Sequence, residues 1–235
     1  MNAVRTLSDT KRSFYARHTR PVNSIYRRVV EELMVEMHLL SVNNLFRYDP
    51  IYALGVVSAY DRLMAGYRPD VDRDSIFGSL CRSIEAEPDQ YRHDADGLRA
   101  IADRLSPLQL ADWRSALPPL DGTELLHDTL QAVATNEKFK YSRLFAIGLY
   151  TLVERADTEI ARDTEKRNEI LASLSESLNI PSDKLEKDLE LYQGNVEKME
   201  QARIIIEDTL ANERKKREAK AAESQPQDPA PETSS

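Results

Sequence analysis

Glu124 and His127 are the residues of this sequence whose types and spacing come closest to a metal-binding motif. A Glu-x-x-His pair on a helix places both side chains on one face, as in the di-iron sites of helical bundles. Such a site needs a second Glu-x-x-His and a glutamate from each of two further helices, and the sequence contains no second pair. The motif is therefore incomplete, and the alternative is a solvated glutamate beside a surface histidine.

The other residues with chemical potential do not form recognisable sites. Cys81 lies on an apolar helical stripe with Phe77 and Ile84, where a cysteine serves packing. The four histidines are too far apart for a tetrahedral zinc set, and the seven glycines are too scattered for a phosphate-binding loop. We therefore expect no catalytic residues, no metal, no cofactor and no enzymatic activity.

The positive charge is concentrated at the start of the chain. The 235 residues carry 32 Lys and Arg against 40 Asp and Glu, a net charge of −8, which makes nucleic acid an improbable partner. The first 30 residues contain one acidic residue, Asp9, and seven basic residues: Arg5, Lys11, Arg12, Arg17, Arg20, Arg27 and Arg28. Such a segment suits contact with anionic lipid or an acidic protein, or it forms a solvated arm or a helix whose arginines face water.

Two further pairs are candidates for contact with a partner. Arg47-Tyr48 and Tyr67-Arg68 stand at predicted helix ends, and aromatic and arginine residues are enriched at interface hot spots.

Apolar residues recur at helical spacing along most of the chain. Thr19-Arg20-Pro21 and Asp49-Pro50 are helix-start signals, because proline at the first helical position gives up only an N–H that has no partner. The stretch from Phe139 to Ala156 is apolar almost all round, which is typical of a helix at the centre of a bundle. No apolar run approaches the length of a membrane span. The pattern predicts an all-α, multi-helix bundle.

The C-terminal part predicts one long helix. Leucine and other apolar residues follow an approximate heptad pattern from Leu185 to Leu210 and end before the charged run 212–218. We expect a basic N-terminal arm over 1–20, a bundle over 21–210, a long helix over 182–220 with a projecting, possible coiled-coil end, and a disordered tail over 221–235. No internal repeat is evident.

Several long segments of the sequence resemble one family. They are residues 18–43 (HTRPVNSIYRRVVEELMVEMHLLSVN), 46–57 (FRYDPIYALGVV), 139–148 (FKYSRLFAIG), 187–192 (KDLELY) and 197–203 (EKMEQAR). Together they are similar to the Thylakoid formation family, also described as photosystem II biogenesis proteins, over about residues 6–217. Because the match begins near Thr6, leaving no room for a plastid transit extension, we expect a cyanobacterial form.

The resemblance implies an all-helical accessory protein attached peripherally to the cytoplasmic side of the thylakoid membrane. It implies roles in thylakoid organisation and in photosystem II assembly and repair, with the FtsH membrane protease, photosystem II subunits and anionic lipid as partners. It supplies no catalytic motif. The alternatives are a direct photosystem II assembly factor, a metal-binding helical protein using Glu124 and His127, and a homotypic coiled-coil scaffold through residues 185–217.

Overall fold

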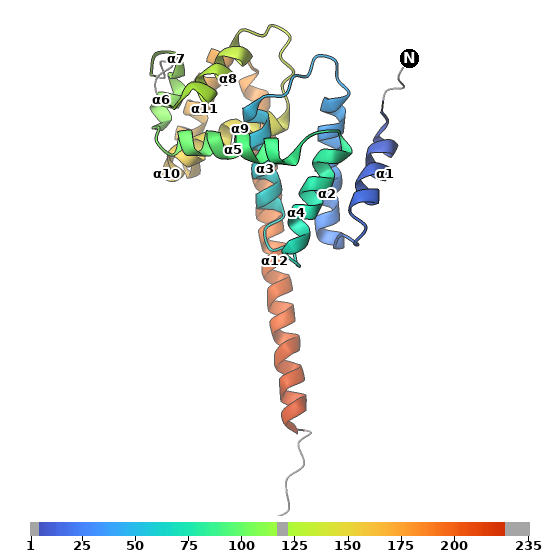
Figure 1. Cartoon of the computed structure of the whole chain (residues 1–235). Helices are drawn as coiled ribbons and strands as arrows, with labels where there is room; N and C mark the ends of the chain where they lie inside the picture. The colour runs from blue at the N-terminus through green and yellow to red at the C-terminus, as the bar shows by residue number, and fades with distance from the viewer. Residues whose placement is uncertain (1–4, 117–121, 224–235) are drawn as a thin grey trace, which may run out of the picture. The chain divides into compact units, whose positions relative to one another are not determined.

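The fold is all-α, as the sequence predicts (Figure 1). The computed structural model describes residues 5–116 and 122–223, and within these ranges it contains twelve helices and no strand. They are α1 (Leu7–Arg17), α2 (Ser24–Ser41), α3 (Pro50–Leu63), α4 (Val71–Ser83), α5 (Pro88–Ala102), α6 (Pro107–Ala111), α7 (Trp113–Ala116), α8 (Glu124–Ala134), α9 (Arg143–Ala156), α10 (Thr158–Arg162), α11 (Thr164–Leu178) and α12 (Ser182–Glu223). The chain divides into a unit that ends at Asn195 and a second unit that begins at Val196.

Helices α3 and α9 form the centre of the first unit. Ten consecutive residues of each helix, 51–60 and 144–153, are buried, so each helix is covered on every side. The two backbones meet at Gly55 and Gly148. A Cβ at Gly55 would lie 1.7 Å from the Leu144 carbonyl oxygen, and one at Gly148 would lie 2.0 Å from that of Ile51. Only glycine permits this approach.

The helix-start signals have different outcomes. Asp49 is the N-cap of α3, where its carboxylate accepts the Tyr52 N–H at 2.8 Å and Pro50 is the first helical residue, so this start is confirmed. The start predicted at Pro21 is wrong, because α2 begins three residues later. Its cap is Asn23, whose side chain accepts the Ile25 N–H at 3.1 Å.

Although the sequence shows no internal repeat, the packing of the two central helices is symmetric. The contacts at Gly55 and Gly148 are reciprocal, because Ile51 and Leu144 hold the same position before their own glycine. An approximate two-fold axis therefore relates α3 to α9, with equivalent residues 93 positions apart. Few residues are identical across the axis, so the repeat is visible in caps and packing rather than in sequence identity.

The same relation extends to the flanking helices. The Tyr48 hydroxyl donates to Asp94 at 2.6 Å, and the equivalent Tyr141 donates to Asp188 at 2.8 Å. Helices α4 and α11 both end in a left-handed residue, Glu85 (φ 63°) and Asn179 (φ 55°). Each of these ends is closed by an N–H bond of 3.0 Å to a carbonyl five residues earlier in the chain. The unit α2–α5 thus corresponds to α8, α9, α11 and the start of α12.

Helix α1 packs on α4 and α2 through buried side chains rather than lying free. Thr10 and Phe14 are fully buried. The Thr10 hydroxyl bonds His38 Nδ1 at 2.9 Å, and His18 Nδ1 bonds the Ser75 hydroxyl at 3.0 Å. The predicted basic arm therefore contains a docked helix.

Helix α12 is longer than predicted, since it continues to Glu223 rather than 220. Its first apolar positions, Leu185, Leu189 and Tyr192, are buried in the first unit. In the second unit Arg203 pairs along the helix with Glu200 at 3.5 Å and Glu207 at 3.9 Å. Whether this segment forms a coiled coil stays a prediction, and the predicted tail from 224 onward lies outside the described residues.

Candidate interaction surfaces

A groove over α2 gathers three of the predicted basic residues. It has a volume of about 590 Å³ and lies between α1, α2 and the start of α9. Its lining residues are Lys11, Ser24, Arg27, Arg28, Glu31, Glu32, Val35, Glu36 and Arg143. We call it the α2 groove.

Most charges of the α2 groove are already paired. Lys11 lies 3.7 Å from Glu31, and Arg28 donates to Glu32 at 2.9 Å. Arg143 pairs with Glu36, and burial raises the pKa of the Glu36 carboxyl although the Arg143 charge opposes that rise. Arg27 is exposed, and within the described chain no carboxylate pairs with it. The free positive charge of the groove is therefore centred on Arg27.

The other basic residues near the N-terminus divide into two groups. Arg5 and Arg20 hold α1 and its flanks in place, since Arg5 pairs with Glu85 at 2.7 Å and Arg20 with the buried Asp72 at 2.6 Å. Arg12 and Arg17 are exposed. Their guanidinium groups stay on α1 itself, Arg12 at 3.2 Å from Asp9 and Arg17 at 3.1 Å from the Ser13 carbonyl oxygen.

The two Arg–Tyr pairs are only partly on the surface. Arg47 is exposed and donates to the carbonyl oxygens of Asn44 and Phe46, each at 2.8 Å. Tyr48 keeps an exposed edge, but burial and its bond to Asp94 raise the pKa of its hydroxyl. Tyr67 is only 2% exposed and packs edge-to-face on Tyr26, so its ring belongs to the core. Its neighbour Arg68 is exposed and pairs with Asp70.

Glu124 and His127 are not brought together with further metal ligands. The Glu124 carboxylate accepts the Gly122 N–H at 2.8 Å, and the His127 ring lies edge-on to Trp113. No group of three or more His, Cys, Asp or Glu side chains suited to a metal ion occurs among the residues with described positions. Both residues thus have local structural roles.

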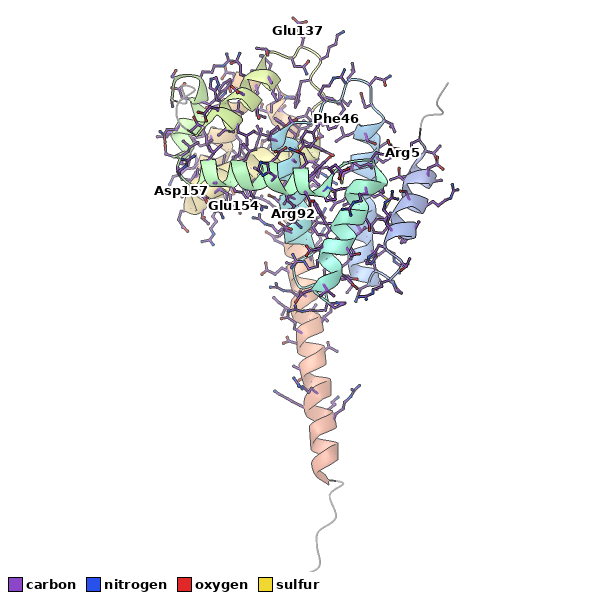
Figure 2. The ribbon with its side chains drawn as sticks, in the orientation of Figure 1. Arg5, Phe46, Arg92, Glu137, Glu154 and Asp157 are labelled. Carbon is purple, nitrogen blue, oxygen red and sulfur yellow. The ribbon has the colours of Figure 1, made fainter. Side chains whose placement is uncertain are left out.

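A second, charged cleft was not predicted from the sequence. It has a volume of about 620 Å³ at the C-terminal ends of α3 and α9, bordered by α5 and α10. Its lining residues are Ser58, Asp61, Arg62, Arg99, Asp103, Thr151, Glu154, Arg155 and Thr158. Figure 2 shows Glu154 and Asp157 in this region, with Arg92 nearby.

Ion pairs cross this cleft and neutralise it. Arg62 pairs with Glu154, and Arg155 pairs with Asp103. Arg92 lies 2.8 Å from Asp61. The residues that line this cleft are distant in sequence, so their proximity could not be predicted. The one signal in the sequence was that Asp61-Arg62 recurs as Glu154-Arg155 after 93 positions, the interval that also separates Gly55 from Gly148.

None of the helices in the described ranges is both long enough and apolar enough to cross a bilayer.

Comparison with known proteins assigns the chain to a family. The model of the Thylakoid formation protein family matches residues 6–221. The chain belongs to this family. Protein Thf1 of Nostoc punctiforme is 54% identical over 224 residues, covering 95% of each chain. Protein Thf1 of Acaryochloris marina is 50% identical over 233 residues, 99% of this chain and 94% of the relative.

A solved structure of a relative has the same fold. The structure of Psb29 at 1.55 Å superposes with a TM-score of 0.78 at 42% sequence identity, covering 91% of this chain and 98% of that one. The resemblance read from the sequence is thereby confirmed. The family is described by thylakoid formation rather than by a reaction, which agrees with the interaction surfaces described above.

Proposed function

We propose that this chain is a non-enzymatic accessory protein of thylakoid biogenesis that acts in photosystem II assembly and repair by binding the FtsH membrane protease. It would attach peripherally to the cytoplasmic side of the membrane. Membership of the Thylakoid formation family carries the proposal. The α2 groove supports it, because it offers an apolar floor at Val35 beside the free charge of Arg27, a combination suited to a protein segment.

Three exposed cations of the N-terminal region suit the membrane attachment. Arg12, Arg17 and Arg27 face solvent, whereas Arg5 and Arg20 are occupied in holding α1. A basic residue near an anionic bilayer contributes roughly 1 kcal/mol, so the three together could hold the chain on the surface.

An affinity pull-down from solubilised cyanobacterial thylakoids tests the choice of partner. Full-length protein serves as bait beside the variant Arg27→Glu/Arg28→Glu, with Arg162→Glu/Lys166→Glu as a charge-matched control on exposed helices elsewhere. We expect FtsH subunits above a tag-only background for the wild type and the control, and a clear loss for the groove variant. Photosystem II subunits without FtsH would instead indicate a direct assembly factor.

A further inference from the structure

Two surface turns of the same construction precede the central helices α3 and α9. They span 43–46 and 136–139. In each, the first asparagine side chain accepts an N–H two residues on, at 2.9 and 3.0 Å, and its carbonyl accepts the phenylalanine N–H. Each phenylalanine packs edge-to-face on a ring of the following helix, at 4.9 and 4.8 Å. A cation follows each turn, Arg47 in one and Lys140 in the other.

Both turns lie at one end of the first unit. Figure 1 accordingly shows both connections at the upper edge of the view. Phe46 and Glu137 are labelled towards that edge in Figure 2, and Glu154 of the charged cleft lies lower.

This end combines exposed apolar and basic side chains. Leu39, at the end of α2, is 59% exposed, and Leu45, at the tip of the first turn, is 50% exposed. Lys138 and Lys140 of the second turn are exposed and, within the described chain, have no carboxylate partner. Arg47 donates only to carbonyl oxygens, so its charge is not neutralised. We call these five side chains the turn face.

We infer that the turn face rests on a lipid bilayer that contains anionic headgroups. Leucines that protrude beside lysine and arginine suit the boundary between headgroups and acyl chains, where apolar tips enter and cations stay at headgroup level. Glu137 is the one acid in the two turns, against the three cations of the turn face, on a chain whose net charge is −8. Charge complementarity therefore favours anionic lipid over neutral lipid.

This inference rests on the proposed membrane attachment but assigns it to a different surface from Arg12, Arg17 and Arg27. Purified full-length protein is sedimented with vesicles of phosphatidylcholine, alone or mixed equally with phosphatidylglycerol. The variants are Arg47→Gln/Lys138→Gln/Lys140→Gln and Leu39→Ser/Leu45→Ser. Arg12→Gln/Arg17→Gln/Arg27→Gln tests the competing N-terminal surface by removing the same charge there, and Arg162→Gln/Lys166→Gln is the control on helices outside both surfaces.

We expect the wild type to bind the mixed vesicles and the turn-face charge variant to bind about a hundredfold more weakly at low salt, roughly fivefold for each cation. The leucine variant should weaken binding at low salt and at high salt alike, because it removes an apolar contact that salt does not screen. Because Arg47 also supports its turn, Lys138→Gln/Lys140→Gln provides a second variant with an expected loss of about twenty-five-fold.

A direct reporter is Leu45→Trp. Its emission should be quenched by vesicles that carry brominated acyl chains, whereas the buried Trp113 should not respond. Turn-face variants that bind like the wild type, while the N-terminal variant loses binding, would overturn this inference and leave the proposed attachment intact. Absence of vesicle binding by the wild type would overturn lipid contact through the turn face and through the N-terminal cations alike. Turn-face variants that bind vesicles normally but no longer sediment with thylakoids would show that a protein covers this face.

Discussion

Gly55 and Gly148 determine how closely the two central helices approach. We expect Gly148→Ala to lower the free energy of unfolding by about 3 kcal/mol or more, because the new methyl would meet the Ile51 backbone, which cannot move aside without displacing α3. Urea denaturation followed by circular dichroism measures the loss. Gly194→Ala is the control: nothing lies within 4 Å of its added Cβ, and it should stabilise α12 by up to about 1 kcal/mol. Equal effects of the two substitutions would contradict the close crossing.

The two part-buried tyrosine–aspartate bonds should be similar in strength, because they occupy equivalent positions. Tyr48→Phe and Tyr141→Phe should each cost about 1–3 kcal/mol of unfolding free energy, the usual contribution of a hydrogen bond to a charged group. The loss should be smaller for Tyr48→Phe, since Gln90 still donates to Asp94 at 2.8 Å. Thermal and urea unfolding of both variants checks the order, and a larger loss for Tyr48→Phe would refute the explanation.

At the scale of elements, α1 is held by two buried histidines whose neutral form is favoured by burial. Burial lowers the pKa of His18, against the opposing charge of Asp72 and with a small contribution from Arg20. Burial likewise lowers the pKa of His38, with Arg5 acting in the same direction and Asp9 against it. At these two positions the folded state therefore binds fewer protons than the unfolded state, whose histidines titrate near 6.5. We expect the contribution of these two histidines to the stability of α1 to be constant above that pH and to be lost as the pH drops below it.

Hydrogen exchange of the α1 amides between pH 7.5 and about 5.5 tests this expectation, because α1 should lose protection before α3 and α9 do. His38→Gln keeps a polar partner for Thr10 but cannot be protonated, so it should flatten the acid-side loss. An unchanged pH profile in this variant would exclude His38 as the cause.

The start of a helix could be predicted where an N-cap residue and a proline coincide, as at Asp49-Pro50. The prediction failed where tertiary contacts determine where the helix begins. Pro21 is a plausible first helical residue, yet Arg20 bonds Asp72 of α4, and the chain turns into α2 only at Asn23. The two-fold relation escaped detection because it depends on backbone geometry. Its two left-handed helix ends use different residues, Glu85 and Asn179.

At the scale of the whole molecule, the apolar stripe of α12 can pack in the first unit or pair with a partner helix. The sequence alone does not distinguish these two roles. Leu185, Leu189 and Tyr192 pack in the first unit, so only about two heptads, from Val196 to Leu210, remain for a partner. Coiled coils are usually supported by three or four heptads or more, and Arg203 lies inside this short stripe. A homotypic scaffold would need the full predicted stripe over 185–217.

We therefore expect the full chain to be a monomer of 26.8 kDa in sedimentation equilibrium, because the stripe left on α12 is too short and is interrupted by a charge. Arg203→Leu should promote dimerisation, since it makes the stripe continuous and removes the pairs with Glu200 and Glu207. Arg162→Leu, which exposes the same apolar side chain on α10, is the control for non-specific association. A wild-type dimer that Arg203→Leu does not strengthen would indicate that the chain associates through another surface, with the α2 groove as the first to test by Arg27→Glu/Arg28→Glu.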